Sequence, residues 1–310
     1  MCIYVFAKNK EEIMRITDKL QAITNGESCV AVGFFDGLHI GHRTLIDRLC
    51  KCGNLRPVLI SLSNNSSPVI YTEEEKSYLL QKSKLDTMFS LSEDIIKNMT
   101  AESFAHDVLN KMLNTKTLVA GEKALFGLDQ VDVNHFRSIG EKYGFTVETV
   151  PMECINGLEV SSDTIKQTIQ DGDFSKVSSM LGAPYLISGT VVHGKGAGHK
   201  FGMPTANISI APNKLFPPHG VYGSISRFQG ENHFGMTNIG LRPSDDDIPI
   251  PTIETFLLNF DRDIYGQKVF LELLVYIRGI RKFEGGLAEV RQQIDKDIKQ
   301  IHSYIEEHLK

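Results

Sequence analysis

One short stretch of the sequence joins an apolar, β-prone run to a helical pattern through a turn rich in glycine and histidine. The apolar run covers 29–32, and apolar residues recur at helical spacing at Leu45, Ile46 and Leu49. The turn between them, residues 33–42, therefore lies where a strand ends and a helix begins. At such a point an α/β sheet exposes free backbone N–H groups and the positive end of a helix dipole, which together favour phosphate oxygens.

The glycines and histidines of this turn suit a nucleotide triphosphate. Gly37 and Gly41 lack a Cβ, so a bulky ligand can approach the backbone closely. His39 and His42 bring two imidazoles to the same place. The alternative is a tight turn whose glycines serve only the backbone and whose histidines face water. Because the pattern specifies many positions at once, we favour the nucleotide site.

Composition limits the class of protein. With 310 residues the chain is about twice the length of a typical domain, which predicts two domains. The formal net charge of −5 gives no general attraction to nucleic acid or to an anionic membrane, so we expect neither partner. No apolar run is long enough for a membrane span, and the first ten residues soon become charged, so a cytoplasmic location is expected.

The cysteines predict no disulfide framework. Their number is odd, and the Cys50-Lys51-Cys52 segment has neither the spacing of a thioredoxin-like pair nor a second ligand pair for zinc. We therefore expect packing roles for all of them: Cys2, Cys29, Cys50, Cys52 and Cys154.

The first half of the chain alternates between strand and helix patterns. Predicted strands lie at 58–60, 117–120 and 145–150, and predicted helices lie between them at 73–82, 101–113 and 133–143. This alternation indicates a parallel sheet covered on both faces, as in a Rossmann-like domain, with ligands at the carboxyl ends of its strands. The glycine and histidine turn lies at one of these ends.

The second half changes to short β-prone runs divided by glycine and proline. A helix ends at Gly182, and the runs at 186–192, 221–226, 234–239, 252–260 and 268–277 predict a small antiparallel barrel or sandwich. We place the domain boundary between 1–182 and 183–310. An apolar stripe then predicts a long terminal helix packed on the barrel; its members are Leu287, Val290, Ile294, Ile298, Ile301 and Ile305.

A second glycine-rich segment lies in the barrel half, between 189 and 207. Backbone amides of such a loop can reach phosphate oxygens, and the candidate residues are Gly194, Lys195, Gly198, Lys200 and Gly202. Thr205 and Asn207 present two neutral oxygens on one face of an extended segment, which suits Mg²⁺ held jointly with substrate phosphates. The alternative is a flexible hairpin.

The turn at 33–42 resembles the His-x-Gly-His signature of the nucleotidylyltransferase superfamily, in the extended form found in prokaryotic FAD synthetases. The resemblance implies that His39 and His42 contact the ATP triphosphate and stabilise the transition state. It also implies ATP contacts from the rest of the turn, namely Gly33, Phe34, Asp36, Gly37 and Gly41.

Further segments are similar to that family, with departures. Residues 121–127 are similar to a turn near the nucleotide, which implies a flavin contact for Phe126 although Ala124 replaces an aromatic residue. Residues 160–166 occupy the place of a Ser-Ser-Thr-x-x-Arg motif, which implies phosphate contacts from Ser162 and Lys166. Here Asp163 replaces threonine and lysine replaces arginine, and 61–68 lack the family's Thr-Phe-x-Pro-His-Pro stretch. The alternative for the serine is a helix cap alone.

The second glycine-rich segment and the motifs after it resemble riboflavin kinases. Its Pro-Thr-Ala-Asn stretch at 204–207, and the segments 220–222, 238–244 and 252–260, fit that family in order and spacing. The resemblance implies that Glu254 is the general base for the terminal ribityl hydroxyl of riboflavin, and that Asn238 and Arg242 bind the flavin. The alternative for the glutamate is a carboxylate on the solvent face of the barrel.

The order of the two resemblances is that of the bifunctional prokaryotic FAD synthetase. It implies that ATP and Mg²⁺ convert riboflavin to FMN in the barrel domain, and that the first domain transfers AMP from a second ATP to FMN, giving FAD and pyrophosphate. We expect a monomer or a weak homo-oligomer. Two other hypotheses are a riboflavin kinase with a degenerate, inactive adenylyltransferase domain and a non-catalytic flavin-sensing regulator.

Overall fold

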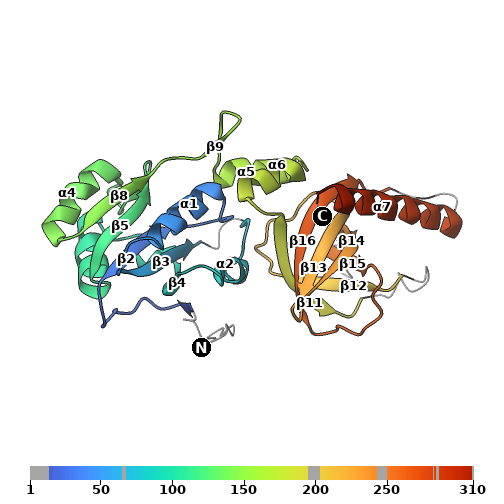
Figure 1. Ribbon diagram of the computed structural model, residues 1–310, viewed down its shortest axis with the longest axis horizontal. Coiled ribbons are helices and arrows are strands. Elements are labelled where there is room, and N and C mark those ends of the chain that lie inside the picture. The colour runs from blue at the N-terminus through green and yellow to red at the C-terminus, as the bar shows by residue number, and fades with distance from the viewer. Residues whose placement is uncertain are drawn as a thin grey trace. The chain divides into compact units, whose positions relative to one another are not determined.

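The computed structural model describes residues 14–64, 68–194, 203–242, 250–281, 283 and 286–308, with the side chains of 242, 250 and 287 left out. The chain divides into two compact units, each described here by itself (Figure 1). The first comprises Met1–Pro68 and Lys76–Ser162, and the second comprises Val69–Glu75 and Asp163–Lys310. The domain boundary after residue 182 stays a prediction.

The first unit is built on a parallel sheet whose strands follow the order β1-β4-β3-β2-β5-β8. Its strands are β1 (Arg15–Thr17), β2 (Ser28–Gly33), β3 (Arg56–Ser63), β4 (Thr87–Ser92), β5 (Thr115–Gly121) and β8 (Thr146–Val150). The chain builds the sheet outward from β2 in both directions, so the strand order reverses between β2 and β5. In open α/β sheets, such a reversal marks the crevice where ligands bind, at the carboxyl ends of the strands.

Helices cover both faces of this sheet, as the strand and helix alternation predicts (Figure 1). On one face α1 (Ile40–Leu49) buries three apolar side chains. On the other face α3 (Ala101–Ser103), its π-helical continuation η2 (Phe104–Met112) and α4 (Val133–Tyr143) share a core with Val30 and Leu118. The residues that follow them, Ala31 on β2 and Val119 on β5, point to the opposite face of the sheet. Both are fully buried, and neither belongs to that core.

Shorter elements complete the chain up to the barrel. They are α2 (Glu73–Leu80), η1 (Glu93–Ile95), the pair β6 (Leu125–Phe126) and β7 (Val131–Asp132), the pair β9 (Cys154–Ile155) and β10 (Leu158–Glu159), α5 (Ser162–Gln170) and α6 (Phe174–Leu181). The predicted helix stop at Gly182 is confirmed, because this residue ends α6 with a φ of 68°. No helix among the described residues is long and apolar enough to cross a membrane.

The second unit holds a closed antiparallel barrel with the strand order β11-β12-β15-β14-β13-β16. Its strands are β11 (Tyr185–Val192), β12 (Thr205–Ile210), β13 (Gly220–Phe228), β14 (Glu231–Arg242), β15 (Ile250–Leu257) and β16 (Lys268–Arg278). The predicted fold class is thus confirmed, with a barrel rather than a sandwich. Each of these described strands pairs with a neighbour on both sides, which closes the barrel.

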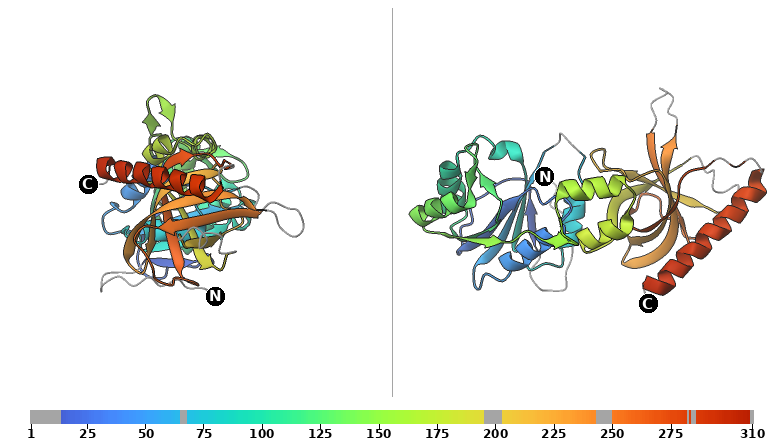
Figure 2. Two further views of the ribbon diagram at one scale, coloured as in Figure 1. Left: turned by 90° about the vertical axis from the view of Figure 1, so that its right-hand side faces the viewer. Right: turned by 90° about the horizontal axis from the view of Figure 1, so that it is seen from above.

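The predicted terminal helix is α7 (Gly286–His308), which packs against β16 and β14 (Figure 2). The apolar stripe accounts for part of this contact, since Ile301 is fully buried. Among the described residues of α7 the most buried polar one is Asp297, which accepts hydrogen bonds from the Arg278 guanidinium at 2.8 to 3.1 Å. A charged pair therefore joins the helix to β16, which the apolar pattern did not predict.

A buried ion pair holds the segment Val69–Glu75 within the second unit. Lys214 Nζ lies 2.7 Å from Glu75 Oε2, and at most 1% of either side chain is exposed. The other oxygen of this carboxylate accepts a hydrogen bond from the Ser188 backbone N–H at 2.6 Å. The ammonium also lies 4.4 Å from the Tyr185 ring centroid. Breaking one side of such a pair leaves an uncompensated buried charge.

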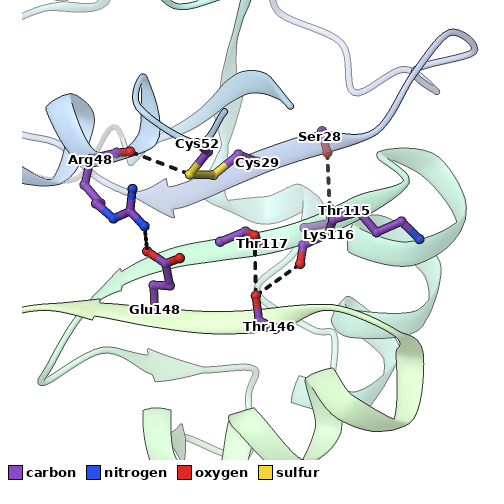
Figure 3. Close-up of a disulfide and its surroundings, with 9 residues drawn as sticks. All are labelled: Ser28, Cys29, Arg48, Cys52, Thr115, Lys116, Thr117, Thr146 and Glu148. Carbon is purple, nitrogen blue, oxygen red and sulfur yellow. Dashed lines mark hydrogen bonds and ion pairs between the residues drawn. A yellow bond between two sulfur atoms is a disulfide. The ribbon is translucent and has the colours of Figure 1, made fainter. Parts of the chain in front are cut away.

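A disulfide joins Cys29 on β2 to Cys52 just after α1, with their Cα atoms 6.3 Å apart (Figure 3). The prediction that all cysteines serve packing is therefore wrong for these two residues. The partner of Cys52 is not the nearby Cys50 but a residue on the strand beneath the helix, 23 residues earlier. Cys50 is free, and burial raises the pKa of its thiol.

Candidate functional site

The first candidate site is the turn between the end of β2 at Gly33 and the start of α1 at Ile40. Two non-glycine residues of this turn, Phe35 and Leu38, have positive φ values of 48° and 43°, a backbone conformation that residues other than glycine rarely adopt. Both are almost fully buried, and their packing offsets the strain. Gly37 lies between them with a φ of 86°, where a Cβ is unfavourable.

The two histidines of the turn form a stacked pair. Their ring centroids are 3.6 Å apart, and His39 Nδ1 accepts a hydrogen bond from the backbone N–H of His42 at 3.3 Å. His39 thereby caps α1. Because Nδ1 accepts, the hydrogen bond assigns the proton of the neutral ring to Nε2, which is then a donor.

Both imidazoles are held in the neutral form. Burial lowers the pKa of His39 to about 4 from the ordinary 6.5, and the nearby Asp36 carboxylate opposes this only in part. Burial also lowers the pKa of His42 well below its ordinary value, and the charges of His39 and Lys76 lower it further. At neutral pH the pair therefore acts through hydrogen bonds rather than through fixed positive charge.

A cavity of about 310 Å³ opens beside the pair. It lies at the carboxyl ends of β2, β5 and β8, since Gly33, Gly121 and Val150 line it, and so at the reversal of strand order. The other lining residues are Val32, Phe35, His39, Gly41, His42, Leu45, Pro151, Met152, Glu153, Val160, Ser161 and Ser162. This is the position where the sequence predicted a phosphate site.

The predicted residues of the turn meet here in different ways. The backbone oxygen of Asp36 accepts a hydrogen bond from the Ser162 hydroxyl at 2.8 Å, which joins the second predicted motif to the first. A Cβ on Gly41 would lie 3.3 Å from the His39 ring, a tight contact. The Phe34 side chain is exposed, whereas its backbone oxygen accepts a hydrogen bond within the protein.

Two predicted residues are not among those that line this cavity. Lys166 belongs to α5 and to the second compact unit. Phe126 is buried in the core of the first unit and stacks on Phe136 with the ring centroids 3.9 Å apart. The phosphate role of Lys166 and the flavin role of Phe126 stay predictions.

Two groups near the cavity were missed by the sequence analysis. Lys76 donates to the backbone oxygen of Phe34, and Glu153, which lines the cavity, accepts from the Thr44 hydroxyl at 3.0 Å. The lysine lies in a run of glutamates that resembles an exposed helix face, and the glutamate lies in an irregular segment. Only the tertiary structure brings them to the turn.

The second candidate site is assembled across three strands of the barrel. Glu254 on β15 stands opposite Asn207 on β12 and opposite Asn238 on β14. Directly opposed residues of antiparallel strands place their side chains on the same face, about 4.5–5.5 Å apart at Cβ. A carboxylate therefore lies between two carboxamides, while its strand neighbours Ile253 and Thr255 are buried on the other face.

The metal candidates belong to this face. Thr205 precedes Asn207 by two positions on β12, so both side chains lie on one side of the strand. Gly194 lies close by, because a Cβ there would come within 2.1 Å of the Asn207 amide nitrogen. Glycine is therefore required at position 194 for close packing against the candidate metal ligand Asn207.

A cavity of about 390 Å³ lies beside Thr205 in the barrel unit, and its lining includes Thr255 from the opposite face of β15 but not Glu254, Asn207 or Asn238. It is lined by Val191, Pro204, Thr205, Ala206, Thr255, Leu257 and the segment 260–265. Tyr265 from that segment stacks on His193, with the ring centroids 3.8 Å apart. The cavity therefore begins at one of the predicted metal ligands and ends at the entrance to the glycine-rich loop.

Several predicted residues fall outside what the structure describes. Lys195, Gly198, Lys200 and Gly202 lie outside the described residues, and for Arg242 only the backbone position in β14 is given. Their assignment to ATP or flavin stays a prediction.

The fold and the sites define a protein of two units with one candidate site in each, and comparison with known proteins identifies its family. A family model described as FAD synthetase matches residues 21–164, and one described as Riboflavin kinase matches residues 181–305. Both enzymatic domains of the predicted pair are therefore present.

Curated relatives cover nearly the whole chain. A bifunctional riboflavin kinase/FMN adenylyltransferase of Buchnera aphidicola (subsp. Schizaphis graminum) is 32% identical over 297 residues, 90% of this chain and 95% of the relative. The enzyme of that name from Escherichia coli K12 is 32% identical over 287 residues, 87% and 91% of the two chains. The chain belongs to the bifunctional riboflavin kinase/FMN adenylyltransferase family, as the sequence resemblance predicted.

A solved structure shares the fold over almost the full length. It is the crystal structure of a Streptococcus pneumoniae protein named a macrolide-efflux protein, with a TM-score of 0.82, 25% sequence identity, and coverage of 93% of this chain and 98% of that one. This likeness supports the two-unit architecture described above.

Proposed function

We propose that this chain makes flavin cofactors in two ATP-dependent steps, in a separate site for each. The barrel unit phosphorylates riboflavin to FMN, and the parallel-sheet unit joins FMN to AMP, giving FAD and pyrophosphate. The observation that carries the proposal is a distinct candidate site in each unit, a stacked neutral imidazole pair in one and a carboxylate between two carboxamides in the other. The two family models support it.

In the kinase step Glu254 orients the terminal ribityl hydroxyl and accepts its proton as the oxygen bonds to the γ-phosphorus of ATP and the bond to the ADP leaving group breaks. Asn238, on the neighbouring strand and the same face, positions the flavin. Thr205 and Asn207 supply a hydroxyl and an amide oxygen, a donor set that suits a hard cation. Mg²⁺ bound there with ATP would neutralise phosphate charge.

In the adenylyl step an oxygen of the FMN phosphate forms a bond to the α-phosphorus of ATP as the bond to pyrophosphate breaks. No covalent enzyme intermediate is needed. The Nε2–H of His39 and the ring of His42 line the cavity and stabilise the charge that develops on the phosphorus oxygens. Ser162, which already bonds the turn, holds the leaving pyrophosphate.

The test is a time course with riboflavin, ATP and Mg²⁺ in which chromatography resolves FMN from FAD. We expect FMN to appear first and FAD to accumulate as FMN is consumed. FMN without FAD would establish a kinase with an inactive first unit. Flavin binding without either product would establish a regulatory protein instead.

We extend the proposal to the setting of the enzyme. The protein acts in the cytoplasm as a monomer or weak homo-oligomer, without nucleic acid or membrane partners, and the net charge of −5 supports the absence of a polyanionic partner.

A further inference from the structure

One carboxylate lines the cavity of the first unit. Glu153 lies in the segment after β8, and its side chain is half-buried. Its Oε1 accepts a hydrogen bond from the Thr44 hydroxyl of α1 at 3.0 Å, and its backbone oxygen accepts one from the Val160 N–H at 2.9 Å. These two contacts fix the carboxylate at the cavity wall.

The other oxygen of this carboxylate is available to a ligand. Within the described ranges, Oε2 of Glu153 has neither a hydrogen-bond partner nor an ion-pair partner. A negative charge repels phosphate, so the part of a nucleotide that contacts this oxygen is not its triphosphate. A carboxylate accepts hydrogen bonds only, and the contacting group must therefore be a donor.

Gly41 relates the carboxylate to the histidine pair. A Cβ at this position of α1 would lie 3.3 Å from the His39 ring and 3.8 Å from Cγ of Glu153. The missing side chain thus leaves space between the imidazole and the carboxylate, and a ligand can occupy that space. If phosphates contact His39, the next group along the nucleotide lies beside Glu153. In ATP that group is the ribose, which carries two neighbouring hydroxyl donors.

The rest of the cavity wall fits the base of the same nucleotide. Leu45, Val150, Pro151 and Met152 supply an apolar lining next to the carboxylate. Ligand cavities typically combine such apolar walls with a few polar groups that fix the orientation of the ligand. An acidic side chain that binds ribose hydroxyls also occurs in other dinucleotide-binding α/β folds.

We propose that Glu153 is the ribose-binding residue of the adenylyl site, where its carboxylate accepts hydrogen bonds from the 2′- and 3′-hydroxyls of ATP and selects a ribonucleotide. This inference rests on the proposed adenylyltransferase function. The ribose does not change during adenylyl transfer, so the contact strengthens nucleotide binding rather than the chemical step. The negative charge also directs the triphosphate away from this wall and toward the histidines.

The test compares ATP with 2′,3′-dideoxy-ATP, which lacks both hydroxyls, in the reaction with FMN. We expect wild type to prefer ATP by about 10- to 100-fold in kcat/KM, the usual effect of hydrogen bonds to a charged group. In Glu153→Ala the value for ATP should fall to that of the analogue, mainly through a higher KM, while the value for the analogue stays unchanged. Glu153→Gln keeps a neutral acceptor oxygen, so its preference should be intermediate.

Two controls and one binding measurement accompany the kinetics. Glu141→Ala removes an exposed carboxylate from α4 in the same unit and should keep the full preference for ATP. FMN formation from riboflavin and ATP takes place in the other unit and should be unchanged in every variant. Calorimetric titration without flavin should show ATP binding that the analogue lacks and that Glu153→Ala loses. If Glu153→Ala does not fold, Glu153→Gln still tests the preference.

The outcomes separate this inference from the function on which it rests. Equal use of both nucleotides by wild type, or an undiminished preference for ATP in Glu153→Ala, would overturn the ribose contact alone. A changed Mg²⁺ requirement with the preference intact would also overturn it, because the carboxylate would then serve the metal. Failure of wild type to form FAD from FMN and ATP would overturn the adenylyltransferase function. A calorimetric preference for ATP that depends on Glu153 would still establish the ribose contact in that case.

Discussion

The two candidate sites differ in how the chain builds them. The first site takes its main residues from ten consecutive positions, 33–42, so one strand-to-helix turn places the stacked histidines without help from distant registers. The second site takes one residue from each of β12, β15 and β14, and it exists only if those strands pair in register. A local site tolerates distant changes, whereas a register-built site depends on the whole barrel.

The largest effect is expected from replacing Glu254, the proposed general base of the register-built site. Glu254→Gln keeps the shape but cannot accept the ribityl proton, so FMN formation should fall by about 10²- to 10⁴-fold. FAD formation from supplied FMN should stay at the wild-type rate. The measurement is the initial rate of each step, and an unchanged FMN rate would remove Glu254 from catalysis.

The second prediction concerns the buried ion pair of the barrel unit, whose two residues lie far apart in the sequence. Lys214→Met leaves Glu75 buried and uncompensated, which should lower the unfolding free energy by about 3–5 kcal/mol. The double variant with Glu75→Gln should recover part of that loss. Denaturant unfolding of the full chain measures both. If the single and the double variant both have the unfolding free energy of wild type, the buried ion pair contributes nothing to stability.

A third change affects the loop that approaches the metal candidate. Gly194→Ala brings a Cβ within 2.1 Å of the Asn207 amide, so Asn207 must move. We expect kcat for FMN formation to fall about 100-fold, with FAD formation unaffected. Gly279→Ala is the matched control, because its Cβ meets the Tyr276 hydroxyl at an ordinary 3.4 Å. Equal kinase activity in the two variants would contradict the close packing.

The smallest effect tests the local site through acid stability. The folded pKa of His39 is about 4 and the unfolded value is 6.5, so between these values the unfolded chain binds more protons. Stability is therefore present above pH 6.5 and is lost as the pH falls, by about 2 kcal/mol between pH 7 and pH 5. His39→Asn, which keeps a capping side chain, should remove the His39 share of this dependence and leave the share of His42, whose pKa burial also lowers. If the stability of the variant depends on pH as steeply as that of wild type, the titrating group is not His39.

The sequence predicts what is periodic or contiguous. The strand and helix alternation predicts the parallel sheet, the apolar stripe predicts α7, and the turn at 33–42 predicts a cavity that the structure places at the strand-order reversal. Each of these depends on residues close together in the chain, whose spacing directly reflects local geometry.

What the sequence does not predict depends on pairing between distant positions. Lys76 and Asp297 resemble exposed charges in helical patterns, yet tertiary contacts bury both. The partner of Cys52 is Cys29, on a strand that only the folded sheet brings beneath the helix. The alignment of Glu254 with Asn207 and Asn238 follows from strand register, which turn and strand patterns alone leave open.

The independence of the two sites is tested most directly by complementation between two inactivated chains. Glu254→Gln and His42→Asn are assayed alone and mixed, with riboflavin, ATP and Mg²⁺. Neither chain alone should yield FAD, whereas the mixture should, because FMN released by the second variant reaches the intact adenylyl site of the first. FAD from either variant alone, or FMN that the mixture never converts to FAD, would contradict two separate sites in one polypeptide.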